Sequence, residues 1–223
     1  MKGFVIAIDG PAGAGKSTVS KIIAQKLNFL YVDTGAMYRV LTLKAIREKI
    51  PWQDKERLIN LAKNTQIELC QDGNKYRVLM DGEDVSEEIR KEEVSKNTSY
   101  IASIIEIREI LWQKQRKFRE KYDIVMEGRD IGSKVFPDAE IKIYLDASIE
   151  ERAKRRYFQL KEIGIEEDMG KIKKEIIERD KRDKEREIAP LIKTDDYYYI
   201  DTTDLTIEEV VKKIISIYKL KVQ

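Results

Sequence analysis

The sequence has 223 residues, a length that fits one core or one domain carrying an insertion. Lys and Arg together number 43 and Asp and Glu 41, so the net charge of +2 gives no long-range field for a nucleic-acid partner. The single cysteine excludes an intramolecular disulfide, and the absence of histidine removes the commonest general base and a common metal ligand. These features favour a protein of a reducing cytoplasm.

Short apolar runs that end at an acidic residue recur along the chain. The first, Phe4–Ile8, is too short to span a membrane and lacks the sections of a signal peptide, so we expect no membrane partner. Similar runs follow at residues 29–32, 124–126, 141–145 and 197–200. Because helical patterns separate these runs, the sequence predicts an α/β fold, with a parallel sheet flanked by helices and polar side chains at the carboxyl ends of the strands.

Between residues 65 and 85 the pattern changes. Apolar and polar residues alternate around Asp72-Gly73-Asn74 and again before Asp81-Gly82, which predicts two or three short antiparallel strands joined by tight turns. Helical patterns flank this segment on both sides. We therefore expect a core formed by residues 1–39 and 106–223, and an inserted domain formed by residues 40–105.

The segment after the first strand matches the P-loop pattern of nucleotide-binding proteins. Its residues are Gly10-Pro11-Ala12-Gly13-Ala14-Gly15-Lys16-Ser17, with Thr18 next to them. A strand before the motif and a helix from Ser17 to about Asn28 provide the context that the motif requires. In such a loop the backbone N–H groups and the lysine bind phosphate oxygens, and the serine hydroxyl ligates Mg²⁺. The alternative is a glycine-rich turn with a chance lysine, but the flanking elements favour a nucleotide site with Mg²⁺. The P-loop alone leaves open whether the protein is a GTPase, an ATPase or a small-molecule kinase.

Two further segments place an arginine beside a backbone bend that a glycine permits, directly after a predicted strand. They are Asp33-Thr34-Gly35-Ala36-Met37-Tyr38-Arg39 and Glu127-Gly128-Arg129-Asp130-Ile131-Gly132. Both follow the same edge of the sheet as the P-loop, so their arginines suit a second phosphate that faces the γ-phosphate. For either segment alone, a strand-end turn with an exposed arginine is the alternative. The only Asn-Lys pair, Asn74-Lys75, lacks the sequence of a guanine-reading motif, which counts against a GTPase.

More motifs follow these. They are Asp81-Gly82-Glu83-Asp84-Val85-Ser86, Val135-Phe136-Pro137-Asp138-Ala139, and Glu178-Arg179-Asp180 with Asp183 and Arg186. Together with the P-loop and the two arginine segments, they make the chain resemble the bacterial cytidylate kinases over nearly its whole length. The P-loop is shared widely, whereas the stretch from Gly128 to Ala139 and the turn from Asp81 to Ser86 are far more specific.

The resemblance implies the nucleoside-monophosphate-kinase variant of the P-loop fold, with a mobile acceptor domain and a short helical lid at about residues 150–170. It implies transfer of a phosphoryl group from ATP to CMP and dCMP with Mg²⁺, in which Lys16, Arg129 and Arg186 are catalytic. It further implies an acceptor site in which the phosphate is held by Arg39, Arg129 and Arg186, the cytosine ring is read by Ser99, Arg108 and Asp130, the ribose is held by Arg179 and Asp183, and Thr34 lies beside the acceptor.

Such an acceptor brings its own nucleophile, an ionised phosphate oxygen, so a chain without histidine needs no protein base. Arg152, Arg155 and Arg156 lie in the predicted lid, although a solvated basic helix face is the alternative for each of them. The spacing of Arg179 and Asp183 also fits a solvated helix. Two other functions stay open, namely a P-loop kinase for another monophosphate and a regulatory nucleotide binder without turnover. No long apolar stripe is left for a partner, so we expect a monomer.

Overall fold

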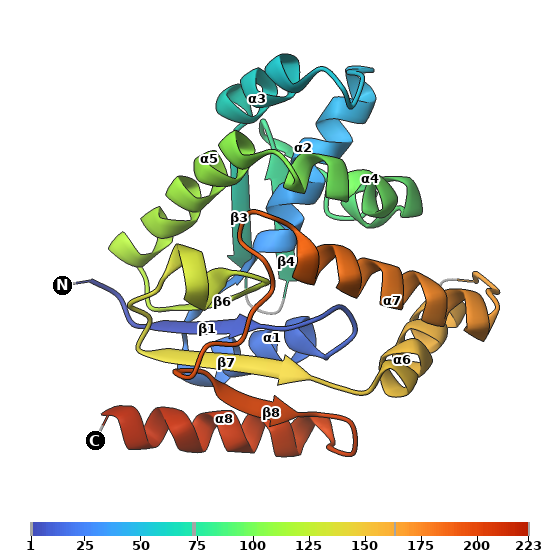
Figure 1. Cartoon of the computed structure of the whole chain (residues 1–223). Helices are drawn as coiled ribbons and strands as arrows, with labels where there is room; N and C mark the ends of the chain where they lie inside the picture. The colour runs from blue at the N-terminus through green and yellow to red at the C-terminus, as the bar shows by residue number, and fades with distance from the viewer. Residues whose placement is uncertain (1, 73–74, 163, 223) are drawn as a thin grey trace. The chain divides into compact units, whose positions relative to one another are not determined.

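The computed structural model describes residues 2–72, 75–162 and 164–222, which form two compact units. We call Val32–Lys121 the inserted unit, and Lys2–Tyr31 together with Tyr122–Gln223 the core unit. Figure 1 shows the elements of both units. In the described part of the chain, no helix combines the length and the apolar character that a membrane crossing requires.

A five-stranded sheet in the order β2-β6-β1-β7-β8 forms the centre of the core unit, and the first residues of the inserted unit complete its edge strand β2. The strands are β1 (Val5–Asp9), β2 (Leu30–Asp33), β6 (Ile124–Gly128), β7 (Ile141–Asp146) and β8 (Tyr198–Asp201). The pairs β1–β6, β1–β7 and β7–β8 are parallel. Every residue of β1 is buried, as expected for a central strand covered on both faces. The predicted parallel sheet is confirmed.

Helices cover this sheet and extend from its carboxyl edge. They are α1 (Lys16–Leu27), the π-helical turn η3 (Ile131–Val135), α6 (Ile149–Glu162), α7 (Met169–Glu185) and α8 (Ile207–Val222). Helix α1 packs against β6 and α8, and α6 packs against α7 as a helical hairpin (Figure 1). Asn28 ends α1 in the left-handed conformation with φ of 56°, so the predicted end of this helix is confirmed.

The inserted unit contains a small antiparallel sheet and a set of helices. Its elements are α2 (Thr34–Arg47), α3 (Lys55–Asn64), β3 (Ile67–Asp72), β4 (Lys75–Met80), β5 (Glu83–Asp84), the 3₁₀ turns η1 (Glu88–Arg90) and η2 (Lys117–Glu120), α4 (Glu92–Ala102) and α5 (Ile105–Arg116). The sheet order is β3-β4-β5, which confirms the predicted antiparallel strands. Gly73 and Asn74 of the first predicted turn lie outside the described residues.

The chain leaves β2 differently from the expectation. The sequence predicts a glycine-permitted bend after Asp33, but α2 begins at Thr34 and Gly35 lies in its first turn. The helix starts here because the carboxylate of Asp33 caps it, accepting a hydrogen bond from the N–H of Ala36 at 3.0 Å. The inserted unit accordingly spans Val32–Lys121, and the narrower acceptor domain of residues 40–105 stays a prediction.

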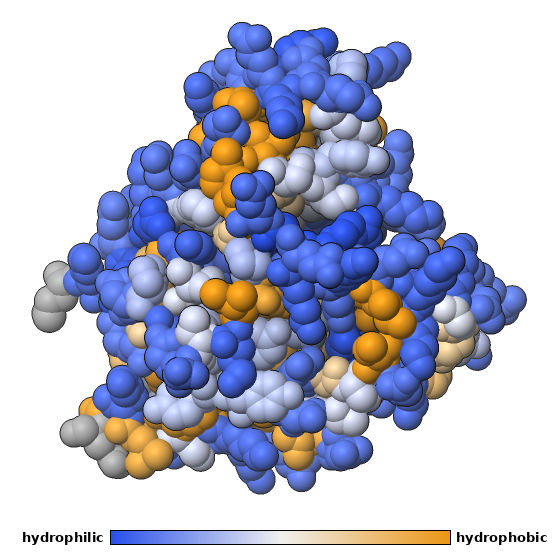
Figure 2. Space-filling view, viewed as in Figure 1, coloured by the Kyte–Doolittle hydropathy of each residue, from blue (hydrophilic) through white to orange (hydrophobic). Residues whose placement is uncertain are grey.

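Charged and polar residues dominate the face shown in Figure 2, with only separate orange areas of hydrophobic side chains. Of all residues in the chain, 38% are Asp, Glu, Lys or Arg. Apolar side chains are buried instead between the sheet and its helices, where Ile6, Ile8, Ile23 and Leu145 are among those with little or no exposed area. Burial of this kind holds the carboxyl edge of the sheet in place.

Candidate active site

The P-loop joins β1 to α1 in the core unit, in the order that the sequence predicts. Gly10, Gly13 and Gly15 all have positive φ, which side chains rarely tolerate. A Cβ on Gly10 would lie only 2.0 Å from the carbonyl oxygen of Leu145. The loop therefore passes directly over the end of β7, and only glycine fits there.

Lys16 is the first residue of α1, and its ammonium group lies inside the P-loop. The side chain is 5% exposed, and Nζ donates a hydrogen bond to the carbonyl oxygen of Pro11 at 2.7 Å. Burial lowers the pKa of Lys16 to about 7, and the positive charge of Arg129 adds to the effect while Glu127 opposes it. A buried lysine among other cations is a site prepared for an anion.

Arg129 follows β6 and pairs with another predicted acceptor-site residue. Its Nε donates to the carboxylate of Asp183 on α7 at 2.9 Å, and Arg186 lies 4.0 Å from the same carboxylate. Burial alone would raise the pKa of Asp183, but the charges of Arg129 and Arg179 outweigh it and the pKa is lowered. Asp183 is therefore an ionised group that holds arginines from two segments.

The remaining predicted residues of the core unit differ in exposure. Asp130 is buried at the start of η3, and Arg179 is exposed on α7. The Nε of Arg186 donates to the carbonyl oxygen of Ala189 at 2.6 Å, just after α7 ends. Within the core unit, the structure therefore brings Lys16 and Arg129 together with the carboxyl end of α7.

The inserted unit carries the other four predicted residues. Arg39 Nη2 donates to Asp33 at 2.9 Å, and Thr34 is buried in the first turn of α2. A Cβ on Gly35 would lie 2.9 Å from the Arg39 guanidinium, so the glycine makes room for this pair. One carboxylate thus caps α2 and also orients Arg39.

Ser99 and Arg108 lie on different helices of the inserted unit. Ser99 is exposed on α4, whereas Arg108 on α5 is 1% exposed and donates to the carbonyl oxygen of Ala102 at 3.0 Å. The Arg108 guanidinium also faces the rings of Tyr38 and Trp112, at 5.5 Å and 5.6 Å. Their predicted contacts with cytosine stay predictions.

The arginines of α6 are not equivalent. Arg152 is 4% exposed and donates to the carbonyl oxygens of Ala147 and of Ala12 in the P-loop, and it pairs with Asp180 at 2.6 Å. Arg155 donates to the carbonyl oxygen of Thr202 at 2.7 Å. The alternative of a solvated basic helix face is therefore wrong for these two arginines, while Arg156 is exposed as that alternative expects.

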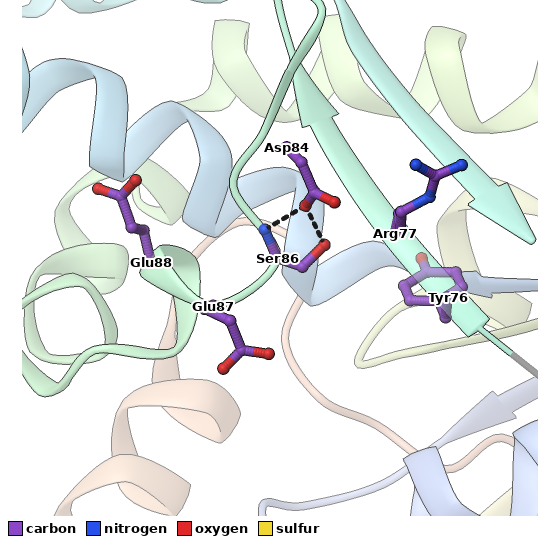
Figure 3. A pocket seen from close by; sticks show the side chains of 6 residues that line it. All are labelled: Tyr76, Arg77, Asp84, Ser86, Glu87 and Glu88. Carbon is purple, nitrogen blue, oxygen red and sulfur yellow. Dashed lines mark hydrogen bonds between the residues drawn. The ribbon is translucent and has the colours of Figure 1, made fainter.

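A groove of about 400 Å³ lies on the inserted unit, outside the predicted site residues. Figure 3 shows the side chains that line it, which are Tyr76, Arg77, Asp84, Ser86, Glu87 and Glu88. The N–H and hydroxyl of Ser86 both donate to the carboxylate of Asp84, at 3.0 Å and 2.6 Å. These bonds close the turn from Asp84 to Ser86 within the inserted unit.

Sequence reasoning missed several polar contacts that shape the site. Asp9 at the end of β1 accepts hydrogen bonds from the N–H groups of Ile131 and Gly132, and from the hydroxyl of Tyr197. Asp180 is the buried partner of Arg152. The acidic ends of the strands were the available signal, but the sequence does not show which distant donor each carboxylate meets.

A parallel sheet with a P-loop at its carboxyl edge, next to a lysine and arginines, defines a nucleotide-binding protein of the P-loop class. A shikimate kinase of Bacteroides thetaiotaomicron shares the fold with a TM-score of 0.50, at 13% identity over 97% of this chain and 98% of that chain. An uncharacterised protein of Eubacterium ventriosum gives a TM-score of 0.52, at 16% identity over 96% and 97% of the two chains.

The sequence narrows the class to one family. The sequence model of the family described as cytidylate kinase matches residues 6–220. A cytidylate kinase of Bacillus cereus is 49% identical over 216 residues, which cover 97% of this chain and 96% of the relative. One of Alkaliphilus oremlandii is 50% identical over 214 residues, covering 96% and 97%. The chain belongs to the cytidylate kinase family.

Proposed function

We propose that the chain transfers the γ-phosphoryl group of ATP to CMP and dCMP, forming ADP with CDP or dCDP. The observation that carries the proposal is a cluster of three cations in the core unit, formed by Lys16, Arg129 and Arg179. Lys16 of the P-loop is buried, and the positive charges of the two arginines help to lower its pKa. The match to the cytidylate kinase family over nearly the whole chain supports CMP as the acceptor. Phosphoryl transfer passes through a loose transition state whose charge such cations stabilise.

We assign a binding role to each predicted site residue. The P-loop backbone and Lys16 bind the β- and γ-phosphates of ATP, and Arg129 and Arg186 bind the acceptor phosphate. We assign Arg39 and Thr34 to the same acceptor, Ser99, Arg108 and Asp130 to the cytosine ring, and Arg179 and Asp183 to the ribose. The acceptor oxygen is already ionised near neutral pH, because the second pKa of a phosphate monoester is about 6.

The residues of the P-loop also fit Mg²⁺. Mg²⁺ takes oxygen ligands and is commonly held by one or two protein oxygens, with water and substrate phosphates as its other ligands. Ser17 is exposed in the first turn of α1, and within the described residues no cluster of three or more acidic, His or Cys side chains competes for the ion. When bound, Mg²⁺ neutralises charge on the β- and γ-phosphates. We propose that Ser17 is its protein ligand.

We also propose which segments of the chain bind the acceptor and which cover ATP. Residues 40–105 form the acceptor-binding domain, and the short helical segment at about residues 150–170 is the lid that excludes water from ATP. The enzyme acts as a monomer in the cytoplasm, where ATP and nucleoside monophosphates are available. Light scattering of the purified chain tests the monomer, for which the mass should be close to 26.1 kDa.

Identification of the product tests the reaction. ³¹P nuclear magnetic resonance of a mixture of enzyme, Mg²⁺, ATP and CMP should show the two diphosphates ADP and CDP appearing together. The variant Lys16→Ala should give neither product while its circular dichroism spectrum matches the wild type. Release of inorganic phosphate without CDP would overturn the proposal, and so would an unchanged rate in Lys16→Ala.

A further inference from the structure

Asp9 is a fully buried carboxylate that belongs to none of the phosphate-binding positions of the P-loop. One oxygen, Oδ1, accepts a hydrogen bond from the N–H of Ile131 at 2.9 Å. The other, Oδ2, accepts from the N–H of Gly132 at 2.8 Å and from the hydroxyl of Tyr197 at 2.7 Å. Burial raises the pKa of Asp9, and the three hydrogen bonds oppose the rise. Donors from two distant segments thus satisfy this carboxylate.

Asp9 accepts hydrogen bonds from the N–H groups of Ile131 and Gly132, and these two residues come immediately after Arg129 and Asp130 in the chain. Before Arg129, Gly128 is held in the sheet, where it is the register partner of Asp9 itself. Arg129 and Asp130 are therefore fixed at both ends, by strand pairing before them and by the Asp9 carboxylate after them. Rotation of this short segment requires that a buried hydrogen bond break.

Tyr197 contacts both Asp9 and Gly132 through its hydroxyl group. A Cβ on Gly132 would lie 2.6 Å from the Tyr197 hydroxyl oxygen, so the phenol rests directly on this glycine. Its ring packs with Tyr144 and Leu191, and the N–H of Leu191 donates to the carbonyl oxygen of Asp183 at 2.8 Å. Burial, together with the negative charge of Asp9, raises the pKa of Tyr197, so its hydroxyl stays protonated.

We propose that Asp9 and Tyr197 are positioning residues for phosphoryl transfer, which act through Ile131 and Gly132 to hold Arg129 in the orientation that the acceptor phosphate requires. The proposal rests on the proposed function, in which Arg129 binds that phosphate. Asp9 is buried and acts through the backbone, so it contributes alignment of the reacting groups. Loss of alignment slows a transfer that depends on geometry, and a displacement of about 1 Å can cost roughly 100-fold in rate.

The variant Tyr197→Phe removes the hydroxyl and keeps the packed ring. We expect kcat with CMP, measured well below the melting temperature, to fall roughly tenfold with KM for ATP unchanged, because the P-loop stays intact. The melting temperature should fall by a few degrees, since a buried hydrogen bond to a carboxylate is lost. Tyr198→Phe is the matched control, since Tyr198 is the neighbouring tyrosine and is 46% exposed, and it should behave as the wild type. Asp9→Asn, which keeps the shape and loses the charge, should reduce kcat at least as much as Tyr197→Phe.

A double-mutant cycle separates positioning from a merely structural role. If Tyr197 acts through Arg129, Tyr197→Phe should have little further effect on kcat in an Arg129→Ala background. The same tenfold loss in both backgrounds would overturn the proposal, as would a loss of kcat that disappears at temperatures where the variant is fully folded. The rates of the wild type and of Tyr198→Phe with CMP test the proposed function separately. If another monophosphate is the better acceptor, the cycle is run with that acceptor.

Discussion

Arg129 and Asp183 are 54 residues apart in the sequence, and the guanidinium of the first donates a hydrogen bond to the carboxylate of the second at 2.9 Å. Asp183 also lies 4.0 Å from Arg186. One carboxylate on α7 therefore orients Arg129 and lies near Arg186, the two core-unit arginines that we propose bind the acceptor phosphate. Its negative charge also balances the positive charges of Arg129, Arg179 and Arg186.

Asp183→Asn should weaken this arrangement while leaving its shape unchanged. A hydrogen bond to a charged group contributes about 1.5–3 kcal/mol, so we expect kcat/KM for CMP to fall roughly 10- to 100-fold. The KM for ATP should not change, because the P-loop is untouched. Steady-state kinetics with each substrate varied in turn measures the effect, with Lys184→Gln, an exposed neighbour on α7, as the control. Equal losses for both substrates would contradict a role confined to the acceptor.

Lys16 should make stability depend on pH in a particular direction. Its pKa in the folded protein is lowered to about 7, chiefly by burial, whereas in the unfolded chain lysine keeps its proton up to about pH 10. Between these values the unfolded state binds more protons, so stability should rise with pH. In Lys16→Met the free energy of unfolding should rise less from pH 7 to pH 9 than in the wild type, although phosphoryl transfer is lost. Urea unfolding at several pH values measures this difference.

Arg39 should contribute to binding of the acceptor and not of ATP. Its side chain is 25% exposed, and Nη2 lies 2.9 Å from the Asp33 carboxylate. The guanidinium is therefore accessible to a ligand and held in one orientation. Arg39→Ala should raise the KM for CMP by roughly tenfold or more, which corresponds to the loss of one charged hydrogen bond. Arg57, 57% exposed in the same unit, supplies a control in Arg57→Ala. An unchanged KM for CMP would remove Arg39 from the acceptor site.

Arg152 and Asp180 should matter mainly for stability. Both are largely buried, with side chains 4% and 12% exposed, and their contact at 2.6 Å joins α6 to α7. Removing one partner of a buried ion pair costs about 3–5 kcal/mol, so Asp180→Ala should lower the melting temperature by roughly 6–20 °C. Arg156→Ala, an exposed position on α6, should not. Calorimetry of both variants provides the comparison, and equal melting temperatures would show that the buried pair contributes nothing.

Local patterns in the sequence predict most of the fold. The P-loop motif fixes the strand, loop and helix from Val5 to Leu27, and alternation predicts the sheet β3-β4-β5. The start of α2 was missed because Gly35 suggests a bend, whereas the capping carboxylate of Asp33 overrides it. The spacing of apolar residues shows which face of a helix or strand is buried, and this signal predicted the elements that the structure confirms.

The contacts of the candidate site were less predictable. Asp183 pairs with Arg129 and not only with its own helix, and Arg152 is buried on a segment whose composition suggests a solvated face. Such pairings depend on which distant segments the fold brings together, and no spacing in the sequence encodes them. The motif positions that carry a charge were found from the sequence, but their partners needed the structure.

We propose that CMP and dCMP are the acceptors, and a coupled assay of ADP formation with separate acceptors tests this assignment most directly. CMP, dCMP, UMP, AMP and GMP are offered one at a time with ATP and Mg²⁺. We predict that kcat/KM for CMP and dCMP exceeds that for the other three monophosphates. Equal or faster turnover of UMP or AMP would contradict the assignment of the cytosine-reading residues, and no turnover with any acceptor would identify a nucleotide binder instead of an enzyme.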